Sequence, residues 1–341
     1  MTEAPASPLV SVLVPAYQEE RTLERAIRST LRQSMGNLEV LVVDDGSTDE
    51  TLTVARALAA ADPRVRVLPS PVNTGPAATR NRGLDAARGT WIALLDADDV
   101  WLPQRLEQLL AASADVDIVC DDVLLVDAIA LERGEVTGVR VLPWLGLALT
   151  QPRLLELEEF IRYDLGYLKP VLRRSAVEQA QLRYRPELRV SEDFSFAVVA
   201  LAKGLTWRQL PQPYYCYRRG EASLSSGPTT IARQQDEVVR SLLSVPQVAA
   251  SPGAVCALRR HERRACAALA YHGVRAAAKG KDVRRLLALV QADPDVPWLL
   301  LEKAWRRAWL VGRRWQLRAD RLPQDSVAAV REAWGPTGAH T

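Results

Sequence analysis

Residues 10–51 read VSVLVPAYQEERTLERAIRSTLRQSMGNLEVLVVDDGSTDET. Two apolar runs, at 10–15 and 38–45, flank a segment at 19–33 whose apolar side chains recur at helical spacing. Strand, helix and strand in this order predict a parallel βαβ unit, because parallel strands need a crossover connection. Near-continuous Val and Leu in both runs is typical of strands that are covered on both faces. We therefore expect these residues to form the first unit of an α/β sheet.

The same alternation continues on the C-terminal side of this unit. The sequence predicts a helix from Asp49 to about residue 60, a strand at 64–68, a helix at 75–89 and a strand at 90–99. Strands that alternate with helices of this length indicate a Rossmann-like, mostly parallel sheet flanked by helices. The expected fold class is therefore α/β.

The regular alternation of predicted strands and helices ends at about residue 100. A helix entered through Pro103 is followed by predicted strands at 117–128 and 135–142, which a glycine-containing turn joins. From about residue 229 the chain is Ala/Leu/Arg-rich helix, with breaks at 246–253, 279–282 and 292–297. We expect one domain over 1–228 and a helical C-terminal extension over 229–341.

Composition and length are those of a globular protein. The 341 residues are 48% hydrophobic and 25% charged. No apolar run reaches the ~18 residues that span a bilayer, and the N-terminal sequence MTEAPASPLV lacks the features of a signal peptide. We therefore expect a cytoplasmic protein. The four cysteines have no ligand or disulfide spacing and are interpreted as reduced core or helix residues.

Positive charge is concentrated near the C-terminus. Residues 253–320 hold 15 Lys/Arg against 6 Asp/Glu, although the whole chain has a net charge of only +3. Within 297–320, Trp298, Trp305 and Trp309 recur at helical spacing among arginines. One interpretation is a terminal helix that packs its Trp side on the rest of the protein. The other is an interfacial helix that makes a peripheral contact with the inner face of the cell membrane.

Polar and acidic residues follow three of the predicted strands. They are Pro15-Ala16-Tyr17, then Asp44-Asp45-Gly46-Ser47, then Asp96-Ala97-Asp98-Asp99. Ligands of open α/β sheets bind beyond the carboxyl ends of the strands. Five carboxylates at one edge would repel one another unless a cation lay between them, and carboxylates of this kind suit Mg²⁺ or Mn²⁺. Taken singly, the Asp-Asp-Gly-Ser segment is also typical of a plain turn, and Asp-x-Asp of a plain surface.

Two other phosphate-binding folds lack their signatures here. A dinucleotide-binding fold needs a glycine-rich turn after its first strand, where this chain reads PAYQEER. The P-loop pattern is also absent from the sequence. A nicotinamide-dependent dehydrogenase and a P-loop kinase are both disfavoured.

These motifs, together with NTGPAATRNRGLDAARG at 73–89, resemble family 2 glycosyltransferases of the GT-A fold over residues 9–110. Three later segments, at 164–175, 182–204 and 214–226, are similar to the acceptor half of bacterial exopolysaccharide transferases of the succinoglycan-biosynthesis type. The resemblance implies a GT-A catalytic domain over 1–228. Its nucleotide-sugar half would cover 1–110 and its acceptor half 111–228.

The resemblance also implies a donor site. Pro15 and Tyr17 would line the nucleoside pocket, and Asp44 would accept a hydrogen bond from the base, with Asp45 nearby. Arg80 would lie near the donor.

Four acidic residues acquire implied roles in the same way. Asp96 would contact the ribose or the donor sugar, and Asp98 would hold the metal that bridges the two phosphates. Asp193 would be the catalytic base, with Glu192 on the acceptor side. Because acidic residues also favour helix N-termini, plain capping by Glu192 and Asp193 stays open as the alternative.

The sequence departs from the family at one place. Many relatives carry a histidine in a Tyr-Arg-x-His segment, where this chain reads Tyr217-Arg218-Arg219-Gly220. Arg218 or Arg219 would then supply positive charge to the diphosphate. We expect the histidines, His261, His272 and His340, to be structural or exposed.

The expected function is inverting, metal-dependent transfer of one sugar from a nucleotide-sugar, with UDP-sugars as the expected donors. The acceptor would be a glycan or lipid-linked oligosaccharide of cell-surface or exopolysaccharide synthesis, and no nucleic-acid partner is expected. A catalytically silent relative that acts as a scaffold stays open. A nucleotidyltransferase is the remaining alternative, although such enzymes carry a Gly-rich signature with a basic residue after the first strand.

Overall fold

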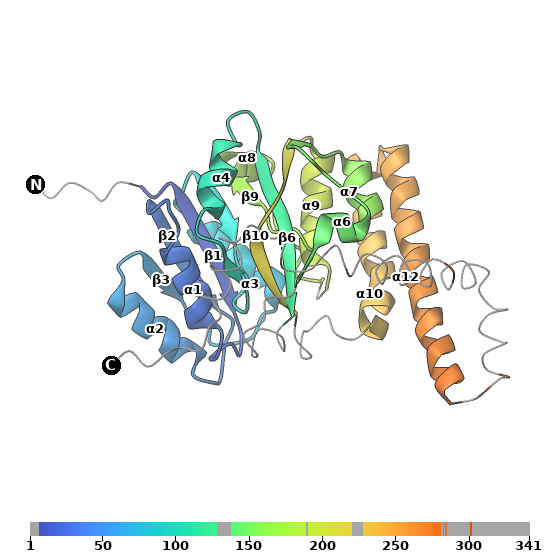
Figure 1. Ribbon diagram of the computed structural model, residues 1–341, viewed down its shortest axis with the longest axis horizontal. Helices are drawn as coiled ribbons and strands as arrows, with labels where there is room; N and C mark the ends of the chain where they lie inside the picture. Colours follow the sequence, from blue (N-terminus) through green and yellow to red (C-terminus); the bar gives the residue numbers. More distant parts are fainter. Residues whose placement is uncertain are drawn as a thin grey trace, which may run out of the picture.

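The computed structural model describes residues 7–127, 138–188, 190–219 and 228–280, together with residues 282, 284 and 301. Ten strands in these ranges form one sheet in the order β3-β2-β1-β4-β9-β6-β10-β5, with β7 paired to β6 and β8 paired to β10 (Figure 1). Helices lie against this sheet, so the predicted α/β class is confirmed.

The first four strands of this order are parallel. They are β1 (Val10–Ala16), β2 (Leu38–Asp44), β3 (Val65–Leu68) and β4 (Trp91–Leu94). Every residue of β2 is buried, as the continuous apolar pattern predicts for a strand covered on both faces. The connecting helices are α1 (Leu23–Leu31), α2 (Thr51–Ala61) and α3 (Pro76–Ala86).

The other half of the sheet is mixed. Strand β9 (Val171–Arg173) runs antiparallel to both β4 and β6 (Ile118–Asp127), whereas β10 (Trp207–Arg219) runs parallel to β6. Three short strands, β5 (Val100–Trp101), β7 (Gly138–Arg140) and β8 (Arg153–Leu154), pair antiparallel. Because β9 is antiparallel, its first residue lies at the edge where β4 ends.

Two predicted strands are shorter than expected. The strand predicted at 90–99 ends at Leu94, and Asp99 N–H donates to Asp96 O in a turn that precedes β5. The strand predicted at 135–142 also ends early, because the N–H of Leu142 donates to the Asp122 carboxylate and helix α6 (Val141–Leu145) begins there. Buried Val and Leu fit either element, so the apolar pattern could not separate them.

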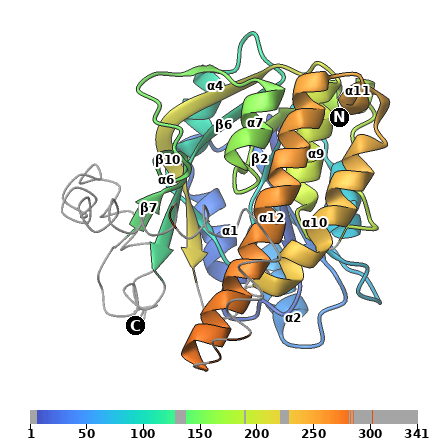
Figure 2. The same cartoon turned by 90° about the vertical axis from the view of Figure 1, so that its right-hand side faces the viewer.

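Further helices lie beside the mixed half of the sheet. They include α4 (Arg105–Ala111), α7 (Leu157–Tyr163), α8 (Arg174–Gln179) and α9 (Glu192–Ala202). Helix α12 (Pro252–Lys279) packs along α10 (Pro228–Leu243) and α7 at the right of Figure 1, and Figure 2 shows α10 and α12 side by side. The predicted break at 246–253 contains one short helix, α11 (Pro246–Ala249), which proline opens at its first turn.

Of the C-terminal predictions, those on residues 297–320 lie outside the described residues, apart from Leu301, which is helical and exposed. None of the helices in the described ranges has the length and apolar character that a bilayer span requires. The division at residue 228 stays a prediction; α10 begins at Pro228. Cys120 and Cys216 are buried free thiols, and Cys256 is an exposed one on α12.

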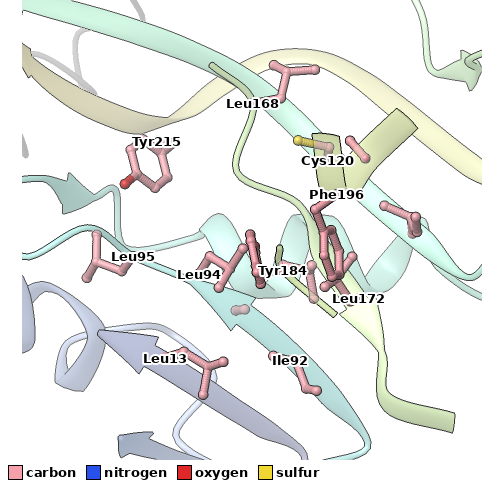
Figure 3. Packing of buried hydrophobic residues seen from close by; sticks show 14 of the residues in the cluster. Leu13, Ile92, Leu94, Leu95, Cys120, Leu168, Leu172, Tyr184, Phe196 and Tyr215 are labelled. Atoms are coloured by element: carbon pink, nitrogen blue, oxygen red, sulfur yellow. The ribbon is translucent and has the colours of Figure 1, made fainter. Parts of the chain in front are cut away.

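The core joins both halves of the sheet. Leu13 of β1, Ile92 and Leu94 of β4 and Leu172 of β9 are buried together (Figure 3). Beside them the ring of Tyr184 stacks on Phe196 of α9 at 4.3 Å.

An ion pair is also buried in this core. The guanidinium of Arg105 contacts Asp121 at 2.8 Å, and their side chains are 0% and 1% exposed. Arg105 also lies over the ring of Trp101 at 4.5 Å and donates to the carbonyl of Lys169. This arginine therefore ties α4, β6 and the chain entering β9 to one another.

We expect Asp121→Ala to lower the free energy of unfolding by about 3–5 kcal/mol, because the buried guanidinium of Arg105 would lose its countercharge. Urea denaturation of the whole chain measures this. Asp115→Ala is the matched control, because Asp115 pairs with Arg208 at the surface. Equal midpoints for the two variants would show that the buried pair is dispensable.

Candidate active site

The ends of β1 and β2 are tied together. The N–H of Asp45 donates to Ala16 O at 2.9 Å, and the N–H of Gln18 donates to Ser47 Oγ at 3.2 Å. These bonds place Pro15, which is half-buried, and Tyr17, whose side chain is 43% exposed, beside the acidic turn that follows β2.

The two aspartates of that turn differ in their contacts. Asp44 accepts long hydrogen bonds from the N–H groups of Gly46, at 3.2 Å, and Ser47, at 3.4 Å. Asp45 accepts from Thr74 N–H at 2.8 Å, Thr74 Oγ1 at 2.7 Å and Gly75 N–H at 2.9 Å. Both oxygens of Asp45 thus hold the distant turn that enters α3. The plain-turn interpretation describes Asp44, which accepts from N–H groups of its own turn.

Arg80 of α3 is the centre of a buried ionic cluster. Its Nη2 donates to Asp96 at 2.9 Å and its Nη1 donates to Glu192 at 2.7 Å. Its Nε lies 3.5 Å from Asp193 Oδ1. The guanidinium therefore joins the end of β4 to the first turn of α9.

Lys169 completes the cluster from the segment before β9. Its ammonium lies 2.7 Å from Asp96 Oδ2 and 2.5 Å from Asp193 Oδ2, and the side chain is buried. Sequence reasoning did not single out this lysine. The available signal was a lone lysine in the apolar run LGYLKPVL. No Asp or Glu lies within four residues of this lysine in the sequence. We name Arg80, Lys169, Asp96, Glu192 and Asp193 the ionic cluster.

Charge pairing dominates the protonation states of the ionic cluster. Burial alone would raise the pKa of Asp96, but Lys169 and Arg80 hold it at about 2. Burial opposes the charge on Lys169, and the carboxylates of Asp193 and Asp96 still raise its pKa well above the ordinary value. The same two carboxylates and Glu192 outweigh burial in raising the pKa of Arg80. Both cations and Asp96 are therefore charged at neutral pH.

Asp98 and Asp99 lie next to the ionic cluster and differ from each other. Asp99 accepts hydrogen bonds from Tyr215 Oη at 2.7 Å and Arg218 N–H at 2.8 Å. Asp98 accepts no bond from another described residue, and burial with the charges of Asp96 and Glu19 raises its pKa to about 7. Within the described residues, the Asp98 carboxylate thus accepts only from its own N–H, and neighbouring carboxylates make its surroundings negative.

These features suit a cation that takes few ligands from the protein. Within the described residues, no three His, Cys, Asp or Glu side chains form a metal-binding group. Mg²⁺ and Mn²⁺ are commonly held by one or two carboxylates while substrate phosphates and water complete the coordination. The free carboxylate of Asp98 fits an ion bound in this way.

Comparison with known proteins now adds the family. A family model described as Glycosyl transferase family 2 matches residues 11–163. The chain is 33% identical to the succinoglycan biosynthesis protein ExoU of Rhizobium meliloti over 265 residues, 74% of each protein. The chain belongs to glycosyl transferase family 2. It is also 38% identical to ExoO of the same organism over 224 residues, which are 64% of this chain and 63% of ExoO.

Solved structures show that this family 2 glycosyltransferase has the GT-A fold. S. aureus TarS in complex with UDP-GlcNAc has a TM-score of 0.57 at 18% identity, covering 83% of this chain and 90% of that one. The mannosyltransferase PcManGT of Pyrobaculum calidifontis, in complex with GDP-Man and Mn²⁺, has a TM-score of 0.51 at 19% identity, covering 97% and 88%. The likeness at this identity concerns the fold alone.

The expected acidic pair lies at a helix start in the glycosyltransferase. Glu192 is the first residue of α9 and Asp193 the second, after Ser191 at φ +56°. Asp193 accepts a hydrogen bond from Lys169 of another segment, and its Oδ1 is buried without a hydrogen-bond donor among the described residues. Capping of α9 does not account for these contacts.

Of the arginines and histidines that the sequence analysis named, the structure describes the side chains of Arg218 and His261. Arg218 is half-buried. Burial raises the pKa of Glu19, and the positive charge of Arg218 partly opposes this rise. His261 is buried, stacks on Phe194 at 4.8 Å and bonds to Gln235, as expected of a structural histidine. The side chains of Arg219, His272 and His340 lie outside the described residues.

We expect Lys169→Met to destabilise the protein by about 3–5 kcal/mol, because three carboxylates would share the charge of Arg80 alone. The pKa of Asp96 is lowered to about 2 from an ordinary 3.8, so its contribution is complete above pH 4 and lost as the pH falls toward 2. Urea denaturation should show a constant difference from wild type at pH 5–9, shrinking below pH 4. The control is Lys203→Met, at an exposed position of the same charge type; a similar loss there, or a difference that grows in acid, contradicts the account.

Proposed function

We propose that the chain is an inverting, divalent-metal-dependent glycosyltransferase. It moves a single sugar from a UDP-sugar to a glycan or lipid-linked oligosaccharide acceptor in cell-surface or exopolysaccharide synthesis. The observation that carries the proposal is the ionic cluster, which holds Asp193 beside Asp96 at the carboxyl edge of β4. Support for the substrates comes from a relative named as a UDP-Glc:alpha-D-GlcNAc-diphosphoundecaprenol beta-1,3-glucosyltransferase, WfgD of Escherichia coli, 39% identical over 103 residues.

In this proposal the donor lies across the ends of β1, β2 and β4. Pro15 and the exposed ring of Tyr17 face the nucleoside, and Asp44, whose own bonds are long, accepts a hydrogen bond from the base. Asp45 acts indirectly, because its oxygens hold the turn before α3. Arg80 keeps Asp96 oriented toward the ribose or donor sugar.

Asp98 would hold Mg²⁺ or Mn²⁺. Such an ion would supply positive charge that stabilises the leaving diphosphate. Arg218 lies close enough to Glu19 to influence its titration and adds positive charge on the same side, a role that Arg219 would share.

Asp193 acts as the general base. The acceptor hydroxyl attacks the anomeric carbon from the face opposite the diphosphate, and its proton passes to Asp193. The new bond joins acceptor oxygen to anomeric carbon, while the bond from that carbon to the phosphate oxygen breaks and its electron pair leaves with the diphosphate. Lys169 donates to Oδ2 of Asp193 and Arg80 Nε lies 3.5 Å from Oδ1, so the two cations hold this carboxylate in position. Glu192 stays paired with Arg80 on the acceptor side.

The proposal extends to organisation and location. The catalytic unit covers 1–228, with nucleotide-sugar and acceptor halves at 1–110 and 111–228, and 229–341 is a helical extension. We place the enzyme in the cytoplasm, at the inner face of the membrane, where a lipid-linked acceptor would be reached. No observation favours a silent scaffold or a nucleotidyltransferase over this function.

A metal-dependent thermal shift tests the donor site. UDP or one UDP-sugar with Mn²⁺ should raise the melting temperature by about 2–4 °C at a hundredfold excess over Kd, because ligand binding stabilises the folded state. Asp98→Ala should abolish the shift, whereas Asp236→Ala, on the exposed side of α10, should keep it. Absence of any nucleotide shift in the wild type with Mn²⁺ present sinks the transferase proposal.

Removal of the base tests the acceptor chemistry separately. We expect Asp193→Asn to lower kcat by about 10²–10⁴-fold, because the attacking hydroxyl loses its proton acceptor. Its Mn²⁺-dependent UDP shift should match that of the wild type, since the donor site is intact. Steady-state transfer assays with Asp236→Ala as the control measure this, and near-normal turnover by Asp193→Asn would remove Asp193 from the role of base.

A further inference from the structure

Three aromatic rings form a continuous row near the ionic cluster. Tyr167 meets Trp144 edge to face at 6.3 Å and 78°, and meets Tyr217 at 6.3 Å and 79°. The side chain of Tyr167 is 39% exposed, and the other two are half-buried. We name Trp144, Tyr167 and Tyr217 the aromatic row.

Tyr167 is held beside the first turn of α9. A Cβ on its neighbour Gly166 would lie 3.0 Å from the Cβ of Phe194, which follows Asp193 in the chain. Leu165 and Leu168 on either side are buried, so the intervening tyrosine is the residue that reaches the surface. Lys169, two residues on, contacts the Asp193 carboxylate. The backbone that carries the exposed ring is thus packed against the start of α9, the helix that also carries the proposed base.

Tyr217 approaches the same place from β10. Tyr215 and Tyr217 are two residues apart in a regularly paired part of this strand, so their side chains point to the same face. The hydroxyl of Tyr215 donates to Asp99 and accepts from the N–H of Asp96. Two separate elements therefore bring the aromatic row next to the acidic groups that the proposed mechanism uses.

The exposure of the Tyr167 ring indicates a surface at which a ligand could be bound. The exposed large hydrophobic side chains of the described residues include two aromatic ones, Tyr17 and Tyr167. Tyr17 follows β1 on the proposed donor side, whereas Tyr167 lies beside α9 on the proposed acceptor side. Binding sites for small ligands are commonly lined by aromatic rings together with a few convergent polar groups.

We propose that the aromatic row is the subsite that binds the terminal pyranose ring of the glycan acceptor. A pyranose has an apolar face of C–H groups, which packs on an aromatic ring, and a rim of hydroxyls, which hydrogen-bond to polar neighbours. Stacking on Tyr167 orients one hydroxyl toward Asp193, while Trp144 and Tyr217 hold the tyrosine ring in place. The inference rests on the proposed function and assigns the acceptor side of that same site.

Saturation-transfer NMR with cellobiose, lactose and maltose tests the assignment on the full-length protein. In the wild type, irradiation of protein protons should transfer saturation to the ring C–H protons of at least one disaccharide. Tyr167→Ala should reduce this signal about tenfold, as expected for the loss of one stacking contact, and Trp144→Ala should reduce it several-fold. Tyr167→Phe should keep it, because the ring and not the hydroxyl makes the contact.

Leu154→Ala is the matched control, an exposed apolar side chain on β8 that lies outside the aromatic row. It should bind the disaccharides as the wild type does. The proposal is overturned if no disaccharide receives saturation from the wild type, or if Tyr167→Ala leaves the signal unchanged. The Mn²⁺-dependent UDP shift, measured on the same Tyr167→Ala sample, separates the two hypotheses. Its persistence there leaves the transferase proposal standing whichever way the sugar experiment falls.

Discussion

Two buried cations, Arg80 and Lys169, share the carboxylates of Asp96, Glu192 and Asp193. Carboxylates removed from water are stable only with a countercharge. The ionic cluster therefore fixes four separate parts of the chain at one point: helix α3, the end of β4, the segment before β9 and the start of α9. The nucleotide-sugar half and the acceptor half proposed for this enzyme meet through these ion pairs.

The sheet topology explains why the partners meet. Parallel strands β1, β2 and β4 end at one edge and place Asp44 and Asp96 there. Strand β9 runs the other way, so Lys169, two residues before it, also lies at that edge. The buried guanidinium of Arg105 donates a hydrogen bond to the carbonyl of Lys169 and thereby fixes the backbone of the lysine. The mixed sheet thus places the Asp96 carboxylate after the end of β4 and the Lys169 ammonium before the start of β9, at the same edge.

Much of this arrangement was predictable. The apolar pattern predicts β1 to β3 within one residue at each end, although the strand predicted at 90–99 ends at Leu94. The resemblance singles out Arg80, Asp96 and Asp193, which the structure brings together. Lys169 was missed because reasoning from the carboxyl ends of parallel strands does not consider the residues that lead into an antiparallel strand. The different contacts of Asp44 and Asp45 depend on Thr74 and Gly75, a contact between distant segments that spacing in the sequence does not contain.

The central claim is that one carboxylate, Asp193, activates the acceptor while no second carboxylate attacks the sugar. The most direct test is the anomeric configuration of the first product formed, followed by ¹H NMR with the active donor. The account predicts inversion, so an α-linked UDP-sugar should give a β-linked product from the earliest time point. An α-linked product would contradict the account, because retention of configuration requires a different mechanism from a single displacement assisted by one base.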